Sequence, residues 1–393
     1  MTEVVIVSAI RTPIGKFGGV FKNTDAVQLG TKLVQTAIDQ LNLPVDAVDE
    51  VIMGNVLGAG LGQNIARQIA IKSGLSETTN AYVVNKVCGS GLKSVILGAQ
   101  SILLGDSEIV IAGGTENMSQ APYLDLSARW GGRLGHRQSI DMMLSDGLTD
   151  AFSQEHMGIT AENIAEKYQI SREQQDEFAV SSQQKAASAI EAERFKEEIV
   201  PFSISQRKGD PIVITTDEGV RPDTTKADLA KLRPAFKKEG SVTAGNASGL
   251  NDGAAIVVMM SKEKAESLNL TPLATIKSYA TAGVDPDYMG LGPIPATEKA
   301  LRKANLSVED LELVEANEAF ATQAIAVTDQ LQLNPEIVNV NGGAIALGHP
   351  IGASGTRVLV TLIHEMMKRD AKNGLATLCI GGGQGISLIV SRP

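Results

Sequence analysis

An internal repetition restricts the fold of this 393-residue chain more than any other feature of its sequence. Three segments recur in the same order near the C-terminus: VIMGN (51–55) as LVEAN (313–317), VN…SG (84–91) as VN…SG (340–355), and IVIAGG (109–114) as TLCIGG (377–382). Their offsets of 262, 256 and 268 residues differ slightly, as loop insertions in a duplicated unit would cause. Chance similarity of glycine-rich segments is the alternative. We therefore predict two copies of one unit, with a site between them.

The order of apolar segments predicts the architecture of each unit. Strands are expected over residues 4–7, 51–53, 81–84 and 108–112, and helices over 24–41 and 92–104. Asn23 or Thr24 is available to cap the first helix, and Gly113-Gly114 should end the last of these strands. This alternation predicts an α/β fold with a largely parallel sheet. Residues from about 119 to 245 break the pattern with polar helices and Arg/Gly-rich loops, so we expect an insertion there.

Composition excludes several classes of protein. The two cysteines make no disulfide framework and argue against a zinc site, and a formal charge of −10 argues against nucleic-acid binding. The N-terminus is typical of a strand rather than of a signal or transit peptide, and no uninterrupted apolar run of about 18 residues occurs. We therefore expect a cytoplasmic protein with reduced thiols and no membrane segment.

Cys88 follows an apolar strand and precedes a helix, in VNKVCGSGL (84–92). A thiol at a helix N-terminus lies near unpaired N–H groups, which favour its thiolate form. The flanking glycines permit the sharp turn of a nucleophile elbow, and Lys86 could add positive charge. A buried structural cysteine is an alternative of equal weight, because free cysteines are usually buried.

Three further candidates lie in the second copy. Cys379 ends a strand at a glycine-rich turn (CIGGGQG, 379–385), whose uncovered N–H groups suit an oxyanion hole. A phosphate loop would require a Lys-Ser/Thr pair, and a turn without chemistry is the remaining alternative. His349 lies between glycines and a proline, at a helix start that mirrors that of Cys88. Asn317 ends a strand and either caps the next helix or orients a water or a carbonyl.

Two other motifs carry less weight. GAGLG (58–62) has the spacing GxGxG rather than GxGxxG and lacks the acidic residue of a second strand, so we do not expect NAD binding. Arg129, Arg133, His136 and Arg137 form a cationic cluster, which is either a solvated loop or a contact for a subunit or an anionic ligand.

Two cysteines and a glycine-held histidine at strand-to-helix turns together predict acyl transfer through a thioester. With these residues the sequence resembles, from end to end, the thiolase family and its bacterial biosynthetic acetyl-CoA acetyltransferases. The resemblance rests on VCGSGL (87–92), HMGITAEN (156–163), TAGNASG (243–249), NEAF (317–320), residues 342–355 and CIGGGQG (379–385).

The resemblance implies the five-layered α-β-α-β-α thiolase fold of two duplicated halves. Residues 1–119 with 248–270 would form the N-terminal half, 271–393 the C-terminal half, and 120–247 a loop domain for tetramerisation and CoA binding. The implied reaction is the reversible Claisen condensation of two acetyl-CoA to acetoacetyl-CoA and CoA, by a ping-pong mechanism through an acetyl-cysteine. A homotetramer, a dimer of dimers, is implied, with neither a metal nor a permanently bound cofactor, since CoA is substrate and product.

The same resemblance implies roles for individual residues. Cys88 matches the acylated nucleophile, and Cys379 the residue that removes the α-proton of the second acetyl-CoA. His349 matches the histidine that activates the nucleophile and shares an oxyanion hole with a water held by Asn317. The N–H groups of Cys88 and Gly381 match a second oxyanion hole. The positions that match the CoA site are Leu148, His156, Met157, Arg221, Phe236, Ala244, Ser248, Met289, Ala319 and Phe320.

Two positions bear on specificity. The pair His156-Met157 is similar to that of short-chain members, which favours acetoacetyl-CoA over long 3-ketoacyl-CoA. Asp228 departs from the serine of some relatives near the adenine, so a CoA contact there is in doubt. A degradative 3-ketoacyl-CoA thiolase and a thiolase-like lipid-binding protein are the alternatives. A ketoacyl synthase uses one Cys with two His, and Cys379 argues against it.

Overall fold

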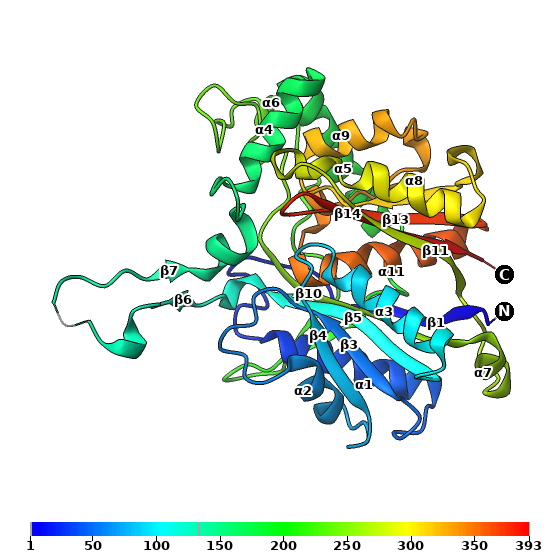
Figure 1. Cartoon of the computed structure of the whole chain (residues 1–393). Coiled ribbons are helices and arrows are strands. Elements are labelled where there is room, and N and C mark those ends of the chain that lie inside the picture. The colour runs from blue at the N-terminus through cyan, green and yellow to red at the C-terminus, as the bar shows by residue number, and fades with distance from the viewer. Residues whose placement is uncertain (1, 133, 393) are drawn as a thin grey trace.

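The computed structural model of the chain describes residues 2–132 and 134–392, which form two sheets, three helical layers and two projecting hairpins (Figure 1). The N-terminal sheet elements and their helices are β1 (Val4–Arg11), β2 (Gly15–Lys16), α1 (Ala26–Leu41), β3 (Glu50–Gly54), α2 (Ile65–Lys72), β4 (Asn80–Val84), α3 (Ser90–Leu104), β5 (Ile109–Asn117), β10 (Asn251–Ser261) and α7 (Lys262–Ser267). The C-terminal ones are β11 (Ala274–Gly283), α8 (Pro293–Ala304), β12 (Leu313–Ala316), α9 (Ala321–Gln330), α10 (Ala344–Leu347), α11 (Ile351–Arg369), β13 (Asn373–Ile380) and β14 (Gln384–Ser391).

The segment between β5 and β10 holds the remaining regular elements. These are β6 (Tyr123–Leu124), β7 (Ile140–Asp141), α4 (Met157–Tyr168), α5 (Arg172–Glu191), β8 (Phe202–Ile204), β9 (Ile212–Ile214) and α6 (Lys226–Leu229). Short 3-10 turns are η1 (Met118–Gln120), η2 (Ala128–Trp130), η4 (Pro286–Leu291), η5 (Val308–Asp310) and η6 (Pro335–Ile337), and η3 (Met143–Leu148) is a π-helical turn.

Strand order repeats between the two sheets, as the internal repetition predicts. One sheet runs β1-β10-β5-β3-β4 and the other β11-β14-β13-β12, and an isolated parallel bridge from Val314 to Val338 takes the place of β4. The sheets join where β1 and β11 pair antiparallel, Val5 with Thr275 and Ile6 with Ala274. The expectation of a largely parallel sheet is wrong, because only β3–β4, β3–β5 and β12–β13 are parallel among the strand pairs described.

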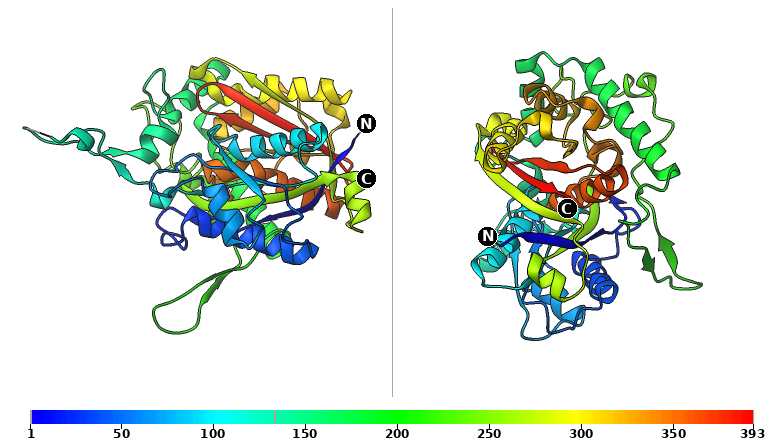
Figure 2. Two further views of the ribbon diagram at one scale, coloured as in Figure 1. Left: turned by 60° about the horizontal axis from the view of Figure 1, so that its bottom comes forward. Right: turned by 90° about the vertical axis from the view of Figure 1, so that its right-hand side faces the viewer.

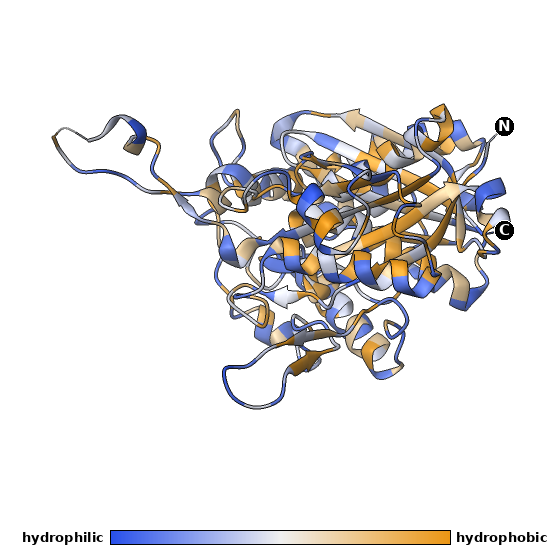
Figure 3. Cartoon of the chain, turned by 90° about the horizontal axis from the view of Figure 1, so that it is seen from below, coloured by the Kyte–Doolittle hydropathy of each residue, from blue (hydrophilic) through white to orange (hydrophobic). Residues whose placement is uncertain are grey.

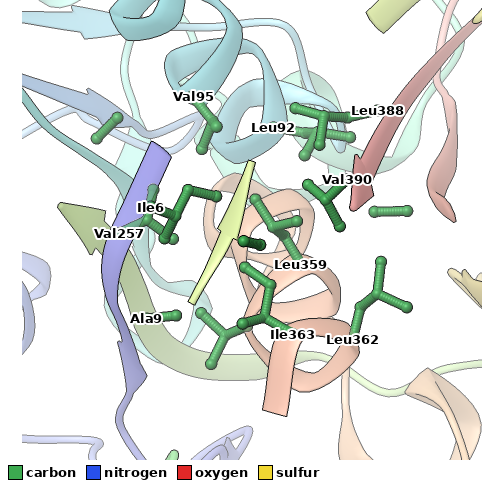
Figure 4. Close-up of a cluster of buried hydrophobic side chains, with 14 of the residues drawn as sticks. Ile6, Ala9, Leu92, Val95, Val257, Leu359, Leu362, Ile363, Leu388 and Val390 are labelled. Carbon is green, nitrogen blue, oxygen red and sulfur yellow. The ribbon is translucent and has the colours of Figure 1, made fainter. Parts of the chain in front are cut away.

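The five layers expected of the thiolase fold are present. Helices α3 and α11 contact each other and pack between the two sheets, α1 and α2 cover the outer face of the N-terminal sheet, and α8 covers that of the C-terminal sheet (Figures 1 and 2). Figure 4 shows the central layer, where Leu92 and Val95 of α3 and Leu359 and Ile363 of α11 meet side chains of both sheets. Full burial of each such side chain contributes about 1.5–3 kcal/mol.

Three local expectations are wrong. Asp25, rather than Asn23 or Thr24, caps α1, in a capping box with Gln28. Strand β5 continues through Gly113-Gly114 to Asn117, because these glycines allow close approach of other backbone rather than a turn. The third pair of repeated segments identifies the corresponding strands, β5 and β13, but in the wrong register. Gly54 pairs with Gly114 and Ala316 pairs with Thr377, so Gly114 corresponds to Thr377 rather than to Gly382.

Helix α3 is the one helix among the described residues that is both long and apolar enough to cross a membrane by length and composition alone. The stretch Val87–Leu104, with mean hydropathy 1.4, passes a length-and-composition test for a membrane span, and 56% of it is buried within the protein. Core helices pass the same test, and α3 packs against β5, β3, β10 and α11. In Figure 3 hydrophobic segments gather inside the body, while the β6–β7 and β8–β9 hairpins project from it.

Candidate active site

A cavity of about 340 Å³ lies where the N-terminal end of α3, the loop before α11 and the turn after β13 meet. Twelve of the fifteen predicted site residues line it: Cys88, Leu148, His156, Met157, Phe236, Ala244, Ser248, Met289, Ala319, Phe320, His349 and Gly381. Cys379 and Asn317 are buried and do not line it, although Cys379 packs with its lining residues. Arg221 lines an adjoining hollow of about 230 Å³ that shares Ala244.

The turn that carries Cys88 is strained. Val87 has a φ of 46°, which β-branched residues avoid at a cost on the order of 1–3 kcal/mol. The Ser90 hydroxyl stabilises this turn by donating to the Val87 carbonyl (2.6 Å) and accepting from the Lys86 N–H (2.8 Å). A Cβ at position 89 would overlap the side chains of Ile380 and Ile386, which would have to shift to admit a larger residue between Cys88 and α3.

Burial dominates the chemistry of the Cys88 thiol. It raises the pKa of Cys88 to about 11, although the N–H groups of Gly381 and of Cys88 itself point to the sulfur and oppose the shift. The N–H groups favour the thiolate, as expected, but the loss of water outweighs them and the net shift is upward. Lys86 is not among the groups that shift the pKa of Cys88, and its ammonium donates to the Gln384 side chain instead.

Cys379 ends β13 next to the first thiol. It is fully buried and packs with Met157, Met289 and Phe320. Burial and the neighbouring Cys88 raise the pKa of Cys379, so both thiols are protonated near neutral pH. A thiol of high pKa becomes a strong base once it has lost its proton.

His349 lies in the turn between α10 and α11 and is held at two points. Its backbone N–H donates to Asn251 Oδ1 (2.9 Å), and its ring Nδ1 lies 2.6 Å from Ser354 Oγ. Its Nε2 has no partner in the part of the chain that the structure describes, and the ring lines the cavity. Burial and the charge of Arg357 lower the pKa of His349 to about 3, so the ring is neutral.

Asn317 follows β12 and is buried with both polar atoms of its side chain unpaired among the described residues. Its N–H donates to the Thr377 carbonyl at 2.9 Å. It does not cap the next helix, because Phe320 is the N-cap of α9. An unpaired buried amide costs about 1–3 kcal/mol, so a water or a polar ligand group would be bound there favourably.

Aromatic stacking shapes the outer wall of the cavity. His156 stacks on Phe236 with centroids 4.5 Å apart, and Phe236 meets Phe320 edge-on. His156 Nδ1 accepts from the Gly158 N–H at 3.0 Å, so its Nε2 carries the proton in the neutral ring. Ser248 donates its N–H to the Ala319 carbonyl at 3.0 Å and thereby ties two walls together.

The adjoining hollow carries the charged groups. Arg221 lines it together with Lys16, and its backbone N–H donates to Gln183 Oε1 at 2.7 Å. Asp228 lies within α6 beside this hollow, where it accepts from Thr225 Oγ1 (2.6 Å) and from Lys231 (3.0 Å). Because Lys231 already pairs with this carboxylate, Asp228 disturbs a CoA contact less than its charge alone suggests.

Sequence reasoning missed three supporting residues. Ser354 and Asn251 hold His349, while Glu116 accepts N–H groups from Val56, Leu57 and Gly352 and so fixes the start of α11. Ser354 stands in the first turn of a helix directly after a candidate histidine, a spacing that could have indicated it. Asn251 and Glu116 gave no such signal, because their partners are distant in the sequence.

Comparison with known proteins agrees with this geometry. The family "Thiolase, N-terminal domain" matches residues 4–263 and "Thiolase, C-terminal domain" matches residues 270–392. The chain is 59% identical over 392 residues to proteins of Pseudomonas aeruginosa and of Cupriavidus necator, each named acetyl-CoA acetyltransferase and each covered completely. Proteins of Staphylococcus aureus named probable acetyl-CoA acyltransferase are 57% identical over the same length.

Solved structures share the fold over its full extent. The crystal structure of the Bacillus anthracis acetyl-CoA acetyltransferase matches with a TM-score of 0.97 and 46% identity, covering 100% of this chain and 99% of that one. Human mitochondrial 3-ketoacyl-CoA thiolase matches with a TM-score of 0.95 and 44% identity, covering 99% and 98%. Since both family domains and full-length relatives match, the chain belongs to the thiolase family.

Proposed function

We propose that this thiolase is an acetyl-CoA acetyltransferase, which condenses two acetyl-CoA to acetoacetyl-CoA and CoA in a reversible reaction. One observation carries the proposal: Cys88, flanked by the N–H groups of Gly381 and of its own backbone, shares a cavity with the unpaired Nε2 of His349 and adjoins the buried Cys379. A nucleophile, a neutral base, a second thiol and oxyanion donors are the groups that acyl transfer with carbon–carbon bond formation requires.

In the first half-reaction the Cys88 sulfur attacks the acetyl carbonyl, and its proton passes to His349 Nε2. The N–H groups of Cys88 and Gly381 stabilise the oxyanion, at about 3 kcal/mol per donor. The bond from the acetyl carbon to the CoA sulfur breaks, and Cys379 donates its proton to that sulfur. The products are acetyl-Cys88, free CoA, a His349 imidazolium and a Cys379 thiolate.

In the second half-reaction the Cys379 thiolate removes an α-proton from a second acetyl-CoA. The enolate oxygen accepts hydrogen bonds from His349 and from a water bound to Asn317. The α-carbon then attacks the acetyl carbonyl, and the bond to Cys88 sulfur breaks. His349 returns its proton to that sulfur, so every group recovers its starting state and acetoacetyl-CoA leaves.

The cavity walls support an acyl-CoA substrate of short chain length. Leu148, Met289 and Phe320 give the pantetheine arm an apolar channel, and Arg221 with Lys16 supplies cations in the adjoining hollow for the phosphates. The closed stack of His156 on Phe236 limits the room beside Met157. No metal and no permanently bound cofactor enter the scheme, since CoA arrives and leaves as substrate and product.

The test combines mass spectrometry with chain-length kinetics. We expect acetyl-CoA to add one acetyl mass to the wild type and none to Cys88→Ala, with Cys379→Ser still acetylated but scarcely able to condense. Thiolysis kcat/KM should be higher for acetoacetyl-CoA than for 3-ketoacyl-CoA of about eight carbons. Acetylated Cys88→Ala would remove the nucleophile assignment, and a preference for the longer chain would indicate the degradative alternative. Absence of any acyl transfer would indicate a lipid-binding protein.

We further propose a cytoplasmic homotetramer divided at the predicted boundaries into two halves and a loop domain, residues 120–247. The β6–β7 hairpin supports this assembly, because its side chains Leu126, Trp130 and Leu134 are apolar and exposed. Strand β4 also ends its sheet with an open edge, a surface that a second copy of the chain could cover. Arg129, His136 and Arg137 lie on the same hairpin, and Arg133 lies outside the described residues.

A further inference from the structure

The hydrogen bonds of one buried serine fix the proton on His349. Ser354 lies in the first turn of α11 and is 1% exposed. Its Oγ is 2.6 Å from His349 Nδ1 and 2.8 Å from the carbonyl oxygen of Pro350. No other hydrogen bond of this hydroxyl is present among residues 2–132 and 134–392, so these two neighbours determine where its single hydrogen points.

Counting hydrogens leaves one arrangement in which both contacts of the serine are hydrogen bonds. The Pro350 carbonyl can only accept, so the Ser354 hydroxyl donates to it. The hydroxyl oxygen then offers a lone pair to Nδ1, which must carry the hydrogen. A neutral imidazole has one N–H, so Nε2 holds the lone pair, and Nε2 is the nitrogen without a protein partner at the cavity. Protonation at Nε2 leaves the bond from Nδ1–H to Ser354 unchanged.

From this geometry we propose that Ser354 is a positioning residue, which holds His349 as its Nδ1–H tautomer so that Nε2 can accept the proton of Cys88. The inference rests on the proposed function of Cys88 and His349. In the other tautomer Nε2 would carry a hydrogen toward the thiol, and no base would remain in the cavity. Ser354 acts only through His349 and does not line the cavity itself.

Nitrogen NMR of the ¹⁵N-histidine-labelled protein tests the tautomer without reference to activity. The chain has four histidines, and the structure assigns opposite tautomers to two of them at the cavity: Nδ1–H for His349 and Nε2–H for His156, whose Nδ1 accepts from Gly158. We expect the wild type to show a protonated Nδ1 and an unprotonated Nε2 for the signal that disappears in His349→Gln. An Nε2–H form of His349 would overturn the proposal.

Kinetics of Ser354→Ala give the second readout. We expect the rate of Cys88 acetylation to fall about 10- to 100-fold, with the KM for acetyl-CoA changed less than about 3-fold, because only the base is misplaced. Ser354→Thr, which keeps the hydroxyl, should recover most of the rate if it folds. Ser278→Ala, which removes a buried serine hydroxyl bonded to the Ala300 carbonyl away from the cavity, is the matched control.

The outcomes separate this inference from the proposed function. Wild-type acetylation at Cys88 with an unchanged rate in Ser354→Ala would refute the positioning role and leave the function standing. A wild type that is never acetylated would refute the function, while the NMR result would still report the tautomer. A rate loss in Ser354→Ala without any change in the His349 nitrogen signals would mean that the serine acts through stability alone, which also refutes the proposal.

Discussion

At the residue scale, a buried ion network joins distant parts of the chain beneath the site. Arg11 is fully buried between Glu198 (2.6 Å) and Asp217 (2.7 Å). Arg357 lies nearby, 3.4 Å from Glu315, and two of its nitrogens are unpaired among the described residues. Burial raises the pKa of Glu315 to about 8 although Arg357 opposes the shift. Glu315 is therefore mostly protonated at neutral pH, which limits the number of charges in the core.

This shift predicts a pH-dependent stability. The pKa of Glu315 rises from an ordinary value of 4.5 to about 8, so its stabilising contribution is complete below about pH 4.5 and is lost as the pH rises through 8. In Glu315→Gln the side chain is a neutral amide, which does not ionise as the pH rises. We expect the free energy of unfolding of the variant, relative to that of the wild type, to rise by a few kcal/mol in order of magnitude between pH 5 and pH 9. Denaturation curves measured across this range give both values. The exposed Glu309→Gln is the control, and parallel curves for wild type and Glu315→Gln would contradict the prediction.

At the element scale, two helices cross so closely that glycine is required on both. A Cβ on Gly91 of α3 would lie 2.8 Å from Thr356 Oγ1 of α11, and one on Gly355 of α11 would overlap the backbone of Leu92. These contacts are reciprocal, as two copies of one unit related by a twofold axis would give. Because Cys88 precedes α3 and His349 precedes α11, the crossing also sets the distance between them.

Gly355→Ala should therefore affect both stability and catalysis. The added methyl group meets backbone rather than a movable side chain, so the helices must separate, at a cost of about 3 kcal/mol. We expect a lower denaturation midpoint together with slower acetylation of Cys88. In Gly253→Ala the nearest atom to the new methyl is 3.4 Å away, at Pro350 Cγ, so this control should change little. Equal denaturation midpoints and acetylation rates of the two variants would show that the helix crossing can accommodate the methyl group.

At the scale of the whole molecule, the β6–β7 hairpin is the most conspicuous projection from the body (Figure 1). Trp130 is 86% exposed and Leu134 is 100% exposed, and burying both against another copy would stabilise an assembly. A pair of short strands, Tyr123 with Asp141 and Leu124 with Ile140, holds the base of the hairpin. The hairpin is thus preorganised to reach a surface outside its own body.

The double variant Trp130→Ser/Leu134→Ser should form a smaller assembly than the wild type. Loss of about 200–400 Å² of apolar contact per copy removes much of the driving force for association at this site. Light scattering coupled to size-exclusion chromatography measures the mass directly. Leu104→Ser, at another strongly exposed position (78%) on the C-terminal end of α3, is the control. An unchanged mass in the double variant would show that the hairpin is not a contact.

The sequence located the candidate chemical groups because these groups lie in local motifs. Cys88, Cys379 and His349 each stand at a glycine-lined turn next to a strand or a helix, and such turns are dictated by a few consecutive residues. The repetition likewise predicted two sheets of equal strand order, since each copy carries the same succession of elements. Full-length resemblance supplied the fold and the family, both of which the comparisons confirm.

Only the tertiary structure decided the direction of the strands, the protonation state of the buried groups and the partners that hold them in place. Gly113 lies against the backbone of β10 and Gly114 against the start of α11, and neither approach can be recognised from the segment alone. Burial by both halves raises the pKa of Cys88 against the local N–H groups, so the net shift is opposite to the one that the local motif favours. The partners of Arg11 are 187 and 206 residues away. Desolvation and ion pairing depend on which distant atoms surround a group, and a sequence read along the chain specifies only its neighbours.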